Sequence, residues 1–156
     1  MKANIGITEK NGQSVVNELS KILADEFVLY TKTRNAHWNI EGADFFEKHK
    51  FFESQYRQLE GFIDEVAERI RKLGFYTPAS LTAFLGLTQL TEVTSEKNDS
   101  KGFIKELLID HESVIINLRE NISKFDKEFH DAGSTDFITG LMEEHEKMAW
   151  ILRSHL

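Results

Sequence analysis

The sequence of 156 residues contains no cysteine and only 1 proline. Without cysteine the chain cannot carry a disulfide framework, a thiol nucleophile, or a cysteine-ligated zinc or iron–sulfur site. The single proline argues against a β-rich fold, because the turns of such a fold are usually marked by proline and glycine. No apolar run approaches the length of about 18 residues that a membrane span needs, and residues 1–14 lack the apolar stretch of a signal peptide. We therefore expect a cytoplasmic, helical protein with no membrane partner.

Positive charge is also scarce, with 19 lysines and arginines against 26 acidic residues and a formal net charge of −7. A folded body with this balance repels nucleic acid unless a local basic arm overrides the repulsion. Residues 1–14 carry only Lys2 and Lys10, offset by Glu9, and no basic extension follows the last apolar-periodic stretch. The sequence thus predicts that DNA binding is weak or absent at physiological salt.

Apolar residues at three- and four-residue steps are the main positive signal. They mark four long helices, at about 14–38, 44–73, 99–129 and from 134 or 135 to the end. We expect one domain over residues 1–156, with residues 1–13 as a short tail. The local signals that support these bounds are an N-cap at Ser14, a capping box at Asp44 and Glu47, a helix-ending Gly74, and Thr77-Pro78 opening a short helix through residue 85.

The long connection between the second and third long helices decides the topology. Two antiparallel hairpins joined by one crossover make a ferritin-type four-helix bundle, here with a short helix in the crossover. An up-down-up-down bundle needs no such crossover and is the second choice. The fold class is therefore all-α.

Six histidines and many carboxylates are present, which are the ligand types that suit iron. Di-iron bundles carry Glu-x-x-His on two helices, but none of these histidines has a glutamate three residues before it. A di-metal site inside the bundle is therefore not expected. Of the histidines outside the first two helices, we expect His111 and His145 to make core hydrogen bonds and His130 and His155 to be solvated.

The second predicted helix carries a different pattern. His49 and Glu53 are four residues apart, as are Asp64 and Glu68, so each pair shares a helix face. His49, Glu53 and Asp64 lie within about 60° of one another around the helix axis. Along the axis, however, His49 and Asp64 are separated by roughly 22 Å. One straight helix cannot bring both to the same ion, since each ligand lies about 2 Å from the metal.

Two copies of this helix can do so. If two chains pack the helix antiparallel about a two-fold axis near Arg57 and Gln58, the histidine end of one chain meets the acidic end of the other, twice. His37 ends the preceding helix and can join the histidine end. Each site then has two imidazoles from one chain and two carboxylates from its partner. Glu53 would either bridge at the metal site or lie behind the direct ligands. The alternative is that these histidines only cap helix ends and the acidic pairs are solvated.

One segment carries a family resemblance. It reads His37-Trp-Asn-x-x-Gly42, Phe45, His49, Phe52-Glu53, Tyr56, Asp64, Ala67-Glu68-Arg69-Ile70 and Leu73-Gly74. This pattern resembles the signature of the Dps family (DNA-binding protein from starved cells), also called miniferritins, and the likeness extends along the chain to Trp150. Glu53 departs from it modestly, because many members have aspartate there.

The resemblance implies a hollow homo-dodecamer with ferroxidase centres at its two-fold interfaces. Members of the family oxidise Fe(II) there, preferentially with hydrogen peroxide, and store ferric oxide in the cavity, so iron is the only cofactor implied. By position, the catalytic and metal-binding residues are His37, His49, Glu53, Asp64 and Glu68, with Trp38 beside the centre either as simple packing or as a trap for stray oxidising equivalents.

The family also admits iron through acidic pores near the start of the last helix. Here that region offers Asp131, Asp136 and Glu143 as a candidate entry pore, with ordinary helix capping and dipole matching as the alternative role of Asp136. Two rival interpretations stay open. The cage could serve as a nucleoid or scaffold protein that does not use the metal site, or another divalent metal such as zinc could occupy it.

Overall fold

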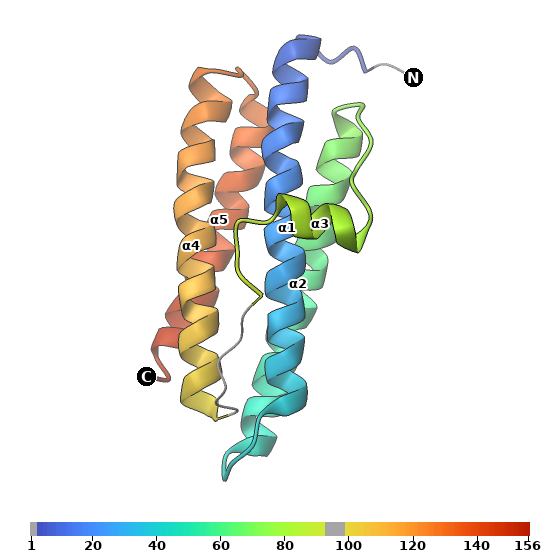
Figure 1. The fold of residues 1–156 in the computed structure, drawn as a ribbon. Coiled ribbons are helices and arrows are strands. Elements are labelled where there is room, and N and C mark those ends of the chain that lie inside the picture. The colour runs from blue at the N-terminus through green and yellow to red at the C-terminus, as the bar shows by residue number, and fades with distance from the viewer. Residues whose placement is uncertain (1–2, 93–98) are drawn as a thin grey trace.

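The computed structural model describes residues 3–92 and 99–156, and all regular structure within them is helical (Figure 1). The elements are α1 (Glu9–Asn39), α2 (Phe45–Lys72), α3 (Leu81–Leu87), α4 (Ser100–Lys127) and α5 (Ala132–Arg153). In the described residues no helix combines the length and the hydropathy that a bilayer span requires.

The four long helices form two antiparallel hairpins, α1 with α2 and α4 with α5 (Figure 1). After α2 the chain passes over α1 through the short α3, and α4 runs in the same direction as α2. This crossover confirms the predicted all-α ferritin-like bundle, with a short helix between α2 and α4, over the up-down-up-down alternative.

The first helix begins five residues earlier than its sequence pattern predicts. Thr8 is the N-cap, and its hydroxyl accepts from the backbone N–H of Asn11 at 3.2 Å. Ser14 lies inside the helix and donates to the carbonyl of Lys10. The added residues are packed, because Gly12 is buried and a Cβ there would lie 3.1 Å from the Phe75 ring. The expected tail of 1–13 is therefore wrong in extent.

Two other predicted caps are also wrong. Asp44 makes no side-chain cap bond to α2, because its carboxylate accepts from the Ser100 hydroxyl and ties the start of α2 to the start of α4. Thr77 donates to the carbonyl of Ala67, so the short helix begins later, at Leu81, with Ser80 as its cap. In both cases a tertiary partner takes the side chain that local spacing assigned to a helix end.

The last helix also begins earlier than predicted, at Ala132, because Asp131 caps it. The predicted end of the second long helix at Gly74 and the predicted start of the third at Asp99 are confirmed. Gly74 has φ +92°, and the Asp99 carboxylate accepts from Gly102 N–H at 2.7 Å. The core runs the length of the bundle between these ends. Its largest fully buried side chains include Phe52 on α2 and Phe125 on α4.

Candidate metal centre

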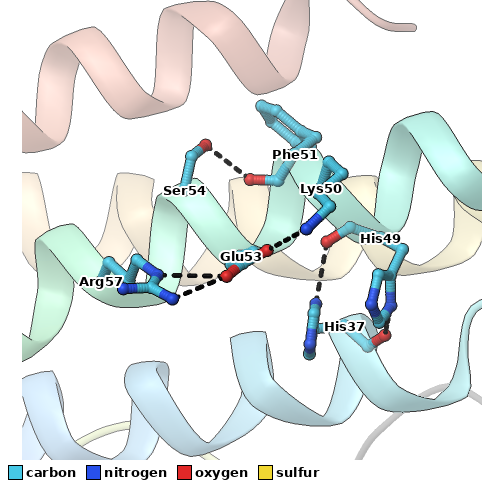
Figure 2. A network of polar contacts seen from close by, with 7 residues as sticks. All are labelled: His37, His49, Lys50, Phe51, Glu53, Ser54 and Arg57. Carbon is cyan, nitrogen blue, oxygen red and sulfur yellow. Dashed lines mark hydrogen bonds and ion pairs between the residues drawn. The ribbon is translucent and has the colours of Figure 1, made fainter.

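His37 and His49 hold each other in place at the end of the α1–α2 hairpin (Figure 2). Nδ1 of His37 lies 2.8 Å from the carbonyl oxygen of His49, and Nδ1 of His49 lies 2.8 Å from the carbonyl oxygen of His37. The two rings stack with centroids 3.8 Å apart. This reciprocal pairing fixes both ring orientations without using a third side chain.

The pairing also fixes which nitrogen of each ring is free. A carbonyl oxygen can only accept, so Nδ1 of each histidine carries a proton and donates it. In the neutral ring the lone pair is then on Nε2, and no partner among the described residues takes up either Nε2. A ring whose Nδ1–H is anchored to a carbonyl is the usual form of a metal-binding histidine. The His37–His49 pair is thus prepared to bind a cation.

The loop that makes this pairing possible is short. α1 ends at Asn39 and α2 begins at Phe45, which places His37 in the last turn of one helix and His49 in the second turn of the next. Gly42 has φ +131°, which residues with a Cβ rarely adopt, and this lets the chain reverse. Ile40 anchors the loop by burying its side chain in the core.

Glu53 lies one turn beyond His49 on α2, and both of its oxygens are paired. Oε2 accepts from Lys50 Nζ at 2.9 Å, and Oε1 accepts from Arg57 at 2.7 Å (Figure 2). The hydrogen bonds from Lys50 and then Arg57 lower the pKa of Glu53 to about 2. The carboxylate is therefore ionised at any physiological pH and is covered by two cations that a metal ion would have to displace.

Asp64 and Glu68 lie far along the same helix, as the spacing requires. Both are exposed, and Glu68 makes a 3.1 Å ion pair with Lys72. Asp64 lines an open hollow of about 580 Å³ between α1 and α2, with Gly61 beside it. Within the described part of one chain, no three histidine or acidic side chains are grouped so that they could hold a metal ion. Of the five predicted ligands, the structure of one chain brings His37 and His49 into contact, while Glu53 lies one turn further along α2 and pairs with Lys50 and Arg57.

Arg34 is a neighbour of the centre that the sequence analysis missed. Its guanidinium lies 4.3 Å from the ring centroid of Tyr56 and 4.9 Å from that of Trp38. The Tyr56 ring meets His37 edge-on at 5.2 Å, whereas Trp38 is 62% exposed. The spacing of Arg34 and Trp38, four residues apart, was the signal available. Lys50 and Arg57 were likewise visible as the i−3 and i+4 neighbours of Glu53.

The three candidate pore residues lie in different surroundings. Asp136 and Glu143 are exposed on α5. Asp131 is only 3% exposed, and its carboxylate accepts from the backbone and hydroxyl of Ser134 and lies 3.3 Å from Arg69. Its charge already serves the helix cap and an ion pair, so Asp136 and Glu143 are the freer candidates.

Comparison with known proteins identifies the family to which the chain belongs. The ferritin-like domain family matches residues 16–156. A DNA protection during starvation protein of Helicobacter pylori is 33% identical over 138 residues, which cover 88% of this chain and 95% of that protein. The chain belongs to the Dps family of ferritin-like proteins.

Two further members of this comparison extend the likeness over nearly the whole chain. The Dps protein of Vibrio cholerae, described as a member of a broad superfamily of ferritin-like diiron-carboxylate proteins, superposes with a TM-score of 0.91 at 32% identity, covering 99% of this chain and 96% of that one. An uncharacterized low temperature-induced protein of Nostoc sp. is 42% identical over 155 residues, covering 99% of this chain and 87% of that protein.

Proposed function

We propose that this Dps-family chain is a ferroxidase and iron-storage protein whose catalytic centre is shared between two copies of the chain. The observation that supports it most is the His37–His49 pair, whose two Nε2 lone pairs are left free by the reciprocal Nδ1 bonds. Two imidazoles alone do not complete a ferrous site. The acidic pair Asp64 and Glu68 is exposed in the C-terminal half of α2, where a second copy of the chain could contact it.

The second copy would pack α2 antiparallel about a two-fold axis. The histidine end of each chain then meets the acidic end of its partner, and one interface makes two equal sites. The hollow beside Asp64 and the open space around Gly61 give the partner helix room to approach. A homo-dodecamer is the assembly typical of this family.

The reaction is the oxidation of ferrous ion, which is substrate and cargo. Two Fe(II) reduce one hydrogen peroxide: with two protons, the products are two Fe(III) and two waters, and no hydroxyl radical forms. His37 and His49 bind and orient the ferrous ion, and the partner's carboxylates neutralise the charge that rises on oxidation. Ferric oxide is then stored inside the shell, which protects the cell, and thus its DNA, from iron and peroxide together.

Charge fits this role better than direct DNA binding. Each copy adds a formal −7 to the particle, which attracts ferrous ions and repels the phosphate backbone. Asp136 near the start of α5 and Glu143 about halfway along it are both exposed, and a ring of symmetry-related carboxylates there would concentrate cations. The protein is proposed to act in the cytoplasm, where ferrous iron and peroxide meet.

Stopped-flow absorbance tests the proposal. Anaerobic protein loaded with Fe(II) is mixed with peroxide or with oxygen, and we expect faster oxidation with peroxide at two Fe(II) per peroxide. The double variant Asp64→Ala/Glu68→Ala should assemble normally and lose about 100-fold or more in rate, since even residues behind the metal ligands cost 10- to 100-fold. Glu65→Ala, an exposed acidic residue of the same helix, is the matched control and should keep the rate.

Other outcomes identify the rival functions. Oxidation no faster than that of free iron would contradict the ferroxidase proposal and favour a cage or scaffold protein. Tight binding of zinc with no iron oxidation would instead assign the site to another metal. A wild-type rate in the Asp64→Ala/Glu68→Ala variant would show that the proposed centre is wrong.

A further inference from the structure

A second cluster of two histidines and a glutamate lies in the core, away from the metal centre. His145 Nε2 on α5 lies 2.7 Å from Glu26 Oε1 on α1, and His145 Nδ1 lies 2.9 Å from His111 Nδ1 on α4. All three side chains are at most 1% exposed. The sequence analysis expected core hydrogen bonds from both histidines, and this is confirmed. It did not anticipate the glutamate.

The hydrogen bonds restrict where protons can be. Only one proton fits between the two Nδ1 atoms, because two facing N–H groups would repel each other. If His145 is protonated on both nitrogens, it donates to Glu26 on one side and to His111 on the other, and its positive charge pairs with the carboxylate. If His145 is neutral, Glu26 is either a buried anion without a counter-charge, which is costly, or a neutral acid that donates to His145 Nε2. Its Oε2 is already buried without a partner among the described residues.

The surroundings favour the charged pair. On α1, Asp25 is buried beside Glu26 and accepts from the Thr88 hydroxyl and the Gln89 N–H. Across the α1–α4 contact, Lys32 pairs with Asp110 and Glu106. From α2 the neighbour of His145 is the Phe62 ring, which carries no charge. The carboxylates around the cluster therefore outnumber the one lysine, and a cation on His145 offsets them.

We propose that Glu26, His145 and His111 form a buried lock that ties α1, α4 and α5 together through one held proton at neutral pH and opens in acid. In the locked state Glu26 is ionised, His145 is cationic, and His111 is neutral with its proton on Nε2. A further proton can only enter by protonating His111 against the His145 N–H, or by protonating Glu26. Either event breaks one of the two bonds and loosens the bundle.

The titration of His111 gives the direction of the effect. Burial first, and the charge of His145 second, hold the pKa of His111 well below its usual 6.5. The unfolded chain therefore binds more protons than the folded one below about pH 6.5, so stability falls as pH falls through this range. Burial raises the pKa values of Asp25 and Asp110, which acts in the opposite direction and must be removed by comparison with a variant.

The test is urea denaturation of the assembled protein at fixed concentration between pH 7.5 and pH 5. Relative to a His111→Asn variant, we expect the wild-type folding equilibrium constant per chain to fall by about tenfold for each pH unit below about 6.5. His111→Asn keeps an acceptor for the His145 N–H but cannot be protonated. The folding equilibrium constant of this variant should therefore depend on pH less steeply than that of the wild type, by the same factor. His130→Asn is the control, because His130 is exposed and has φ +54°, which asparagine tolerates.

Equal pH slopes in the wild type and His111→Asn would overturn the proposal. A measurement on the unaltered protein decides the matter even if the variant does not fold. In solid-state NMR of the sedimented, ¹⁵N-histidine-labelled assembly at pH 7, His145 should show both ring nitrogens protonated and His111 only one. A neutral His145 at pH 7 would contradict the lock. Neither result depends on iron oxidation, so this proposal and the ferroxidase proposal can fail separately.

Discussion

The cluster of His37, His49 and Glu53 at the end of the α1–α2 hairpin, called the surface cluster although His37 is only 8% exposed, and the buried cluster of His111, His145 and Glu26 each contain two histidines and one glutamate. They arrange these side chains in opposite ways. At the surface each Nδ1 donates to a backbone carbonyl, so both Nε2 atoms stay free. In the core the imidazoles and the carboxylate bond to one another in a line. The surface cluster is thus suited to take up a metal ion and the buried one to hold a proton.

The difference shows that residue type alone does not define a metal site. What matters is whether the donors converge on an empty point or are already used. The helix-end position of the surface histidines supplies two backbone carbonyls as anchors, whereas the core offers only other side chains. In the proposed centre the surface cluster is completed by a second chain, while the buried cluster is complete within a single protomer.

The largest effect we expect comes from removing the cation of the buried cluster. His145→Leu leaves the Glu26 carboxylate buried without a partner and should cost about 3–5 kcal/mol of unfolding free energy at pH 7. His49→Leu at the surface should cost about 1 kcal/mol or less. Urea denaturation of both variants measures the contrast.

A double variant sharpens this prediction. Glu26→Leu combined with His145→Leu removes both charges and should recover much of the loss, because replacing both partners by apolar groups is far less costly than stranding one. If the double variant is as unstable as the sum of its single variants, the pair is not coupled and the interpretation of the buried cluster is wrong.

A smaller effect is expected from the cations that cover Glu53. Arg57→Gln removes one of the two positive partners that a metal ion must displace, so Co²⁺ or Zn²⁺ should bind several-fold to about tenfold more tightly in calorimetric titration at low salt. Arg71→Gln, on the same helix but away from Glu53, should leave the affinity unchanged. Weaker binding in Arg57→Gln would mean that the arginine helps to build the site.

The smallest effect concerns the acid titration of Glu53 itself. Its pKa of about 2 lies below the usual value of 4.5, so the ion pairs contribute stability above about pH 4.5 and lose it as pH falls toward 2. Because Lys50 is exposed to solvent, we expect Lys50→Gln to lower the melting temperature only slightly at pH 7 and not at all near pH 2. A larger loss at low pH than at pH 7 would contradict this sign.

The sequence predicted the bundle and the pairing of His37 with His49, because helical periodicity and a short loop determine both. It also predicted that Asp64 could not join these histidines in one chain, which follows from the rise of a helix. It misplaced the caps at Asp44 and Thr77, since their side chains bond to residues that only the tertiary fold brings near. Glu26 was missed for the same reason: its partner is 119 residues away.

In the proposed centre, each metal site takes its histidines from one chain and its acidic pair from another. Co-assembly of two inactive variants is the decisive test: His37→Ala/His49→Ala is mixed in equal amounts with Asp64→Ala/Glu68→Ala and assayed for peroxide-driven Fe(II) oxidation. In random mixing half of the two-fold interfaces pair unlike chains, and each of those holds one intact site and one doubly impaired site. We therefore predict about one quarter of the wild-type rate from the mixture, with neither variant active alone. A mixture as inactive as its two components would contradict a centre shared between chains.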